Sequence, residues 1–167
     1  MRILLGGLLA SFVLWAFPVW GQISDSQVVA LVEALRLVTS NSSGRDDGLE
    51  SAWNIKPANI TRWSRLCIGE ELTPEEFNLD RTKAQYILVC VMEDVLRNEY
   101  PLSGDDENIA VRRAAAWWVS GDANLYDRGE FRHYTQQVLN LYQDLRAQPS
   151  DFLPTRTAKT LKASKGF

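Results

Sequence analysis

Apolar residues recur along most of this chain at steps of three and four, the period of an α-helix with one buried face. The first such run predicts a helix that begins near Ser24 and Gln27, which can form a capping box, and that ends at Thr39. The polar stretch 40–48 that follows predicts a loop. The apolar face of this first helix consists of Val28, Leu31, Val32, Leu35 and Val38.

Helix start signals divide the middle of the chain. Pro57 favours the first position of a short helix through Trp63, and the segment 73–76 (Thr-Pro-Glu-Glu) is a second start signal. A long helix is then expected from about 80 to 100, with Pro101 helping to end it. Its buried stripe would be Ala84, Ile87, Leu88, Val91 and Val95.

Two more helices are predicted near the C-terminus. The acidic residues 105–107 favour a helix start, and Gly121 is well placed to end that helix. One side of this helix would carry Ala110, Ala114, Trp117 and Trp118, and the final helix would carry Phe131, Tyr134, Val138, Leu141 and Leu145. No internal repeat and no alternating strand pattern is present, so we expect a mainly α fold.

The first 21 residues have the features of a secretory signal peptide. A positive start at Arg2 precedes an apolar stretch 3–20, and Val19 and Gly21 suit cleavage after residue 21. The alternative is an uncleaved membrane anchor, since a spanning helix needs about 20 apolar residues. We therefore expect an exported protein, periplasmic or extracellular, with a helical domain at 22–148 and a basic, solvated tail at 149–167.

Composition narrows the classes further. The 167 residues include 18 basic and 21 acidic side chains, a formal net charge of −3, which is too balanced for a nucleic-acid binder that works by bulk positive charge. A hydrophobic content of 46% excludes a disordered chain. The length suits one domain with a sizeable core.

Export changes the interpretation of the two cysteines. In an oxidising compartment a Cys67–Cys90 disulfide is expected, which would close a loop of about 24 residues and contribute roughly 3 kcal/mol. Two buried free thiols are the alternative. Metal binding is disfavoured because His133 is the only histidine, and we expect no cofactor.

Four segments in order resemble soluble lytic transglycosylases and goose-type lysozymes. Segment 48–60 resembles their G-x-x-G-x-x-Q-I-x-P stretch, and 69–77 their L-T-P-x-x-F stretch. Segment 114–121 is similar to their A-A-Y-N-x-G helix, with Trp118 near the tyrosine position, and 134–142 to their closing helix. The resemblance implies a helical lysozyme-like fold, with a groove in which the β-1,4 bond between N-acetylmuramic acid and N-acetylglucosamine of peptidoglycan is cleaved.

The chain departs from this family at the general acid. The position that matches the usual glutamic acid is Thr39, whose hydroxyl is not acidic near neutral pH. Glu50 is the best replacement, since the nearby Trp53 could desolvate it and raise its pKa, and Asp47 (or Asp46) could serve as base or electrostatic partner. The alternative is that these are solvated acids of a polar loop.

The tryptophans and two asparagines are the candidate ligand contacts. Trp53 and Trp118 lie on segments that line the groove in the family, whereas Trp63 and Trp117 extend apolar helical patterns and fit a core role. Asn54 and Asn59 could hydrogen-bond an acetamido group. Asn59 could equally cap the local turn.

Two functions of different classes follow. The first is an exported enzyme that cleaves peptidoglycan with Glu50 as general acid. The second is a catalytically inactive lysozyme-like domain that binds peptidoglycan, a related N-acetylated glycan or a protein partner, and Thr39 favours it. Contact with a membrane is expected only through an uncleaved signal segment.

Overall fold

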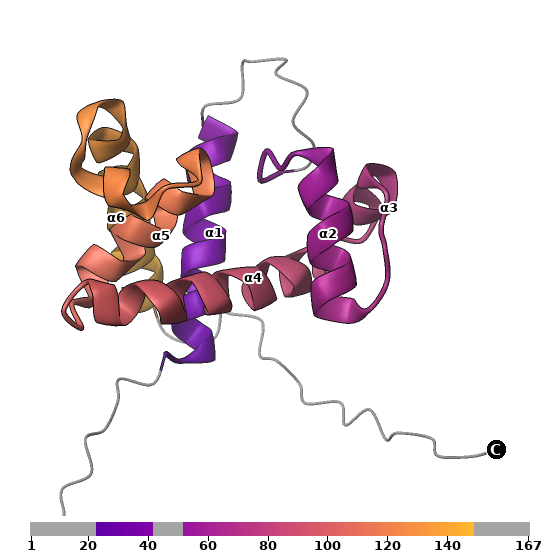
Figure 1. Cartoon of the computed structure of the whole chain (residues 1–167), viewed down its shortest axis with the longest axis horizontal. Helices are drawn as coiled ribbons and strands as arrows, with labels where there is room; N and C mark the ends of the chain where they lie inside the picture. Colours follow the sequence, from indigo (N-terminus) through magenta and orange to yellow (C-terminus); the bar gives the residue numbers. More distant parts are fainter. Residues whose placement is uncertain (1–22, 42–51, 149–167) are drawn as a thin grey trace, which may run out of the picture.

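The computed structural model describes residues 23–41 and 52–148, which form a set of packed α-helices (Figure 1). No strand occurs in this described part, so the expected mainly α fold class is confirmed. The predicted signal segment 1–21, the polar segment 42–48 and the tail 149–167 lie outside the described residues. The elements in chain order are α1 (Asp25–Asn41), α2 (Pro57–Ile68), α3 (Pro74–Leu79), α4 (Arg81–Leu102), α5 (Glu107–Ser120), the 3-10 helix η1 (Ala123–Asp127) and α6 (Gly129–Ala147).

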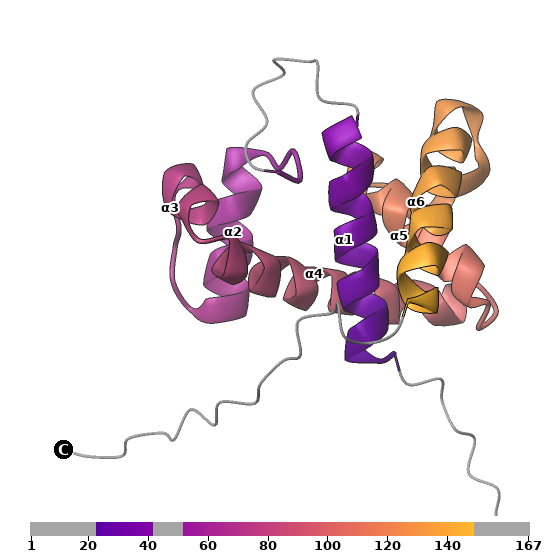
Figure 2. The ribbon, with the colours of Figure 1, turned by 180° about the vertical axis from the view of Figure 1, so that it is seen from behind.

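Helix α4 is the element against which most of the other helices pack. It contacts α1, α2, α3 and α5. In Figures 1 and 2, α2 and α3 lie at one end of α4, and α5 and α6 lie toward its other end. The predicted stripe is buried as expected, with Ala84, Ile87, Leu88, Val91 and Val95 all in the core. Among the described helices, none is long and apolar enough to cross a membrane.

Local capping signals fix the helix starts as predicted. The amide of Ser24 donates to Gln27 Oε1 at 2.7 Å, and the amide of Gln27 donates to Ser24 Oγ at 3.3 Å. Thr73 and Glu76 form a second, reciprocal capping box at the start of α3. Helix α2 begins at Pro57, where the missing amide hydrogen has no helical partner to lose.

Three helix ends lie beyond their predicted positions. Helix α1 continues past Thr39 to Asn41, and α2 continues past Trp63 until Gly69, whose φ of 75° ends it. Pro101 lies inside the last turn of α4. At an exposed helix end the missing proline amide costs one hydrogen bond, and the Ser103 amide satisfies the Glu99 carbonyl at 3.0 Å.

Small side chains bring α5 close to its neighbours. Its alanines Ala110 and 114–116 are fully buried, and the helix ends at Gly121 (φ 82°) as predicted. The hydroxyl of the buried Tyr142 on α6 donates to the carboxylate of Glu107 at the start of α5. Burial raises the pKa of Tyr142, so the phenol remains a hydrogen-bond donor.

The first and last described residues lie at the same end of the helical domain. Helices α1 and α6 pack against each other, and Arg146 Nη1 near the end of α6 donates to Ser26 Oγ at the start of α1, at 2.8 Å. Residues 23 and 148 therefore lie at the same end of the helical domain.

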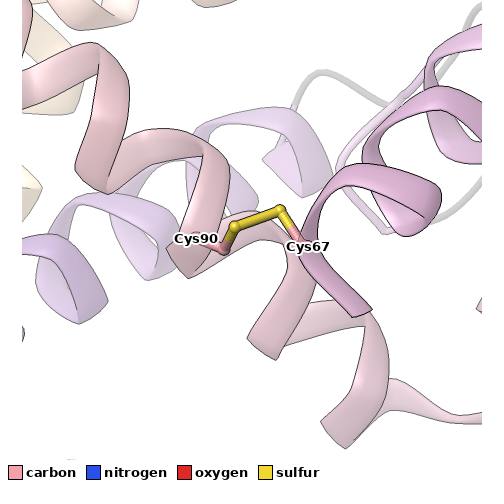
Figure 3. Close-up of a disulfide and its surroundings, with 2 residues drawn as sticks. All are labelled: Cys67 and Cys90. Carbon is pink, nitrogen blue, oxygen red and sulfur yellow. A yellow bond between two sulfur atoms is a disulfide. The ribbon is translucent and has the colours of Figure 1, made fainter. Parts of the chain in front are cut away.

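A disulfide joins the last turn of α2 to the middle of α4, as predicted. The sulfur atoms of Cys67 and Cys90 lie 2.16 Å apart and their Cα atoms 6.0 Å apart (Figure 3). Both residues are partly exposed. The chain-entropy model gives such a cross-link ~3 kcal/mol of stabilisation.

Candidate functional site

Three tryptophans meet between α2 and α5. The ring of Trp63 on α2 lies 6.4 Å from that of Trp117 and 5.7 Å from that of Trp118, both on α5, and the ring planes are tilted by 31° and 30°. Trp63 is buried, whereas Trp117 and Trp118 are partly exposed. These three residues, here called the tryptophan cluster, thus combine a buried backing ring with two rings that reach solvent.

Trp53 has a different environment from the one that its sequence position suggested. Its side chain is 3% exposed and belongs to the core, and its Nε1–H donates to the backbone carbonyl of Val32 on α1 at 3.2 Å. The indole fixes the segment before α2 against the middle of α1. Of the two tryptophans expected to contact ligand, only Trp118 has a partly exposed side chain, and Trp63 has the predicted core position.

Thr39 is the residue for which the sequence resemblance predicted the place of a general acid. It is 7% exposed, and its Oγ1 donates to the carbonyl of Leu35, one turn earlier in α1, at 2.8 Å. The hydroxyl is therefore used within the helix and carries no ionisable proton near neutral pH. The carboxylate of Glu33 on the same helix is in an ion pair with Arg36, 2.6 Å away.

The two candidate asparagines lie at the entry to α2. Asn54 is exposed and has a φ of 52°, a left-handed conformation that asparagine tolerates in turns. Asn59 is partly buried in the first turn of α2, and its Oδ1 accepts a hydrogen bond from Arg62 at 3.3 Å. The N-cap position of α2 is Lys56, and no side-chain hydrogen bond caps this helix start. The candidate catalytic residues Glu50 and Asp47 lie outside the described residues.

Two arginines in the middle of α5 bind residues of neighbouring elements. Arg112 donates to the carbonyl of Tyr126 and to Asp127, each at 3.0 Å, and Arg113 donates to Glu99 on α4 at 2.7 Å. Both guanidinium groups lie over the ring of Tyr126, 5.2 and 5.8 Å from its centroid. The sequence offered no signal for this network, because its members come from three separate elements.

The pKa of Asp127 should test this network. We expect that pKa to lie below the ordinary aspartate value of about 3.9, chiefly because Arg112 donates to the carboxylate. A lowered folded-state pKa gives stabilisation that is present above the unfolded-state value and is lost as the pH falls through the folded-state value. An NMR titration of the carboxyl carbon checks this. The midpoint should rise in Arg112→Gln, and a midpoint at or above ~3.9 in the unaltered protein would contradict the expectation.

Metal chemistry has no support in the described part of the chain. Within residues 23–41 and 52–148, no group of three or more histidine, cysteine, aspartate and glutamate side chains is placed to hold a metal ion. His133 is exposed on α6, and both cysteines are in the disulfide.

Comparisons with known proteins identify no relative of this chain: no protein-family model, no curated protein and no solved structure matches it. The functional assignment therefore rests on the residues and their arrangement.

Proposed function

We propose that this chain is an exported lysozyme-like domain that binds the glycan strand of peptidoglycan, or a related N-acetylated glycan, through Trp117 and Trp118. The tryptophan cluster is the observation that carries the proposal. An indole face is flat and apolar and can cover the C–H face of a sugar ring, and a partly exposed indole retains such a face. The buried Trp63 supports the other two rings from behind, at 6.4 and 5.7 Å.

Polar contacts would complete the recognition of an N-acetylated sugar. Asn54 presents an exposed amide next to the buried Trp53. A side-chain amide can both donate to and accept from an acetamido group. Because Trp53 ties this segment to α1, Asn54 is held by a rigid neighbour on its N-terminal side.

The local chemistry of α1 favours binding over cleavage. Glycosidic cleavage needs a carboxylic acid that can protonate the leaving oxygen. At the family's acid position Thr39 donates its hydroxyl to Leu35, and Glu33, six residues earlier in α1, is in an ion pair with Arg36. Cleavage would therefore depend on Glu50 and Asp47, the two candidates from the sequence.

Loss of Trp118 should reduce glycan binding. We expect Trp118→Ala to bind purified peptidoglycan at least about tenfold more weakly, since truncating a tryptophan at the centre of a binding surface typically costs roughly 2 kcal/mol. Sedimentation of the protein with insoluble peptidoglycan measures this. The matched control is Val119→Ala, which removes a 48% exposed apolar side chain from the adjacent position and should bind normally.

The same preparation separates binding from cleavage. If Trp118→Ala binds as well as the unaltered protein, the proposed site is wrong. Release of soluble muropeptides that is lost in Glu50→Gln would instead make the domain a glycosidase. If the protein neither binds peptidoglycan nor releases muropeptides, that result would exclude a glycan ligand and favour the alternative of a protein partner.

A further inference from the structure

Helix α2, the turn after it and α3 form a small unit, here called the α2–α3 unit (residues 57–79). The unit is braced internally by Leu72, whose amide donates to Ser64 Oγ at 2.9 Å and whose carbonyl accepts from Thr61 at 3.3 Å. Among the described helices the unit packs chiefly against α4, and its Trp63 also meets Trp117 and Trp118 on α5. The position of the unit relative to the rest of the domain therefore depends on its attachment to α4, together with the tryptophan cluster and the hydrogen bond from Trp53, just before α2, to Val32 on α1.

The disulfide is the covalent part of that attachment. It fixes the last turn of α2 to the middle of α4 (Figure 3). The ion pair between Glu70 and Lys83 also joins the unit to α4, but its 3.7 Å separation and its exposure make it weak. Cys67 lies four residues after Trp63, so both side chains project from the same face of α2. The cross-link thus acts one helical turn away from the buried ring of the tryptophan cluster.

We propose that the Cys67–Cys90 disulfide is a redox-sensitive clamp that holds Trp63 against Trp117 and Trp118. A dithiol reductant opens the clamp. One of its thiolates attacks a sulfur of the disulfide, which breaks the bond between Cys67 and Cys90, forms a mixed disulfide with one cysteine and releases the other. The second thiol of the reductant then attacks the mixed disulfide and releases the remaining cysteine. The dithiol gives up two electrons and two protons and becomes a disulfide, and Cys67 and Cys90 become free thiols. Partial exposure of both cysteines gives the reductant access.

The opening is local because the other helices keep their own contacts. Helices α1, α5 and α6 pack against one another or against α4 without the α2–α3 unit. The hydrogen bond from Arg113 to Glu99 fixes α5 to α4 at a distance from the disulfide. The effect of the clamp on glycan binding rests on the proposed function, whereas its effect on the α2–α3 unit does not.

Hydrogen exchange on the full chain, oxidised and reduced, tests the clamp. We expect the amides of α2 and α3 to exchange about 100-fold faster after reduction with dithiothreitol, and those of α5 and α6 to change little. The double variant Cys67→Ser/Cys90→Ser should match the reduced protein and should not respond to the reductant. Sedimentation with peptidoglycan should show weaker binding of the reduced protein, and reoxidation should restore it.

The outcomes separate the clamp from the proposed function. Unchanged exchange in α2 and α3, or an equal increase in all helices, would overturn the clamp. Undiminished binding by a reduced protein whose α2 exchanges faster would also overturn it, because the cluster would then not depend on the clamp. If the oxidised protein binds no peptidoglycan but α2 responds to reduction, the glycan proposal fails and the clamp on the α2–α3 unit stands.

Discussion

Replacing Trp53 by alanine is expected to lower the free energy of unfolding by about 4 kcal/mol. The indole is 3% exposed, so its removal leaves a large cavity in the core. The change also removes the hydrogen bond to the Val32 carbonyl. Denaturation by urea, followed by circular dichroism, measures the loss.

Trp53→Phe is the matched control for this prediction. Phenylalanine fills most of the volume of the indole but cannot donate the hydrogen bond. We therefore expect Trp53→Phe to lower the free energy of unfolding by less than half as much as Trp53→Ala. A loss below ~1 kcal/mol in Trp53→Ala would show that the indole is not part of the core.

Replacing Glu99 by alanine is expected to cost about 3 kcal/mol. The ion pair between Glu99 and Arg113 is nearly buried, with side chains 13% and 12% exposed. Removing the carboxylate leaves a positive charge that water reaches poorly. The contacts of Arg113 with Asn124 and the ring of Tyr126 offset only part of this cost. The measurement is again the free energy of unfolding.

Glu93 on the same helix provides the control. It forms an ion pair with Arg97 at 2.6 Å, but the arginine is 68% exposed. A solvated pair contributes little, so Glu93→Ala should change the free energy of unfolding by no more than about 0.5 kcal/mol. Equal effects of the two substitutions would show that burial does not determine the strength of these ion pairs.

Features that depend on local sequence could be predicted well. The two capping boxes, Pro57 at a helix start and Gly121 at a helix end involve residues within one turn of each other. The apolar stripe of α4 follows directly from helical periodicity. The Cys67–Cys90 pairing was predictable because a chain with two cysteines allows only one intramolecular pairing.

Features that depend on distant segments could not be predicted. The indole of Trp53 donates to a carbonyl 21 positions earlier in the chain, and Arg113 reaches a glutamate on another helix. No spacing rule encodes either contact. The extension of α1 past Thr39 was also not predicted. Polar residues such as Ser40 are typical of a loop and are equally compatible with a last helical turn, so the sequence does not fix where the helix ends.

The candidate site was predicted only in part. Trp118 was expected on the ligand-binding surface from its place in a family-like segment, and the structure leaves it partly exposed. Its contact with Trp63 was not foreseen, because both residues continue apolar helical patterns and the pattern does not show which helices meet. The predicted acids Glu50 and Asp47 remain predictions.

The proximity of residues 23 and 148 has a consequence for how this domain can be built into a larger chain. Arg146 and Ser26 bring the two ends within one hydrogen bond. A domain whose ends adjoin can be inserted into a loop of another protein, or circularly permuted through a short linker, without rerouting its helices. Both connections would then meet the domain beside α1 and α6, and neither would need to pass through the α2–α3 unit.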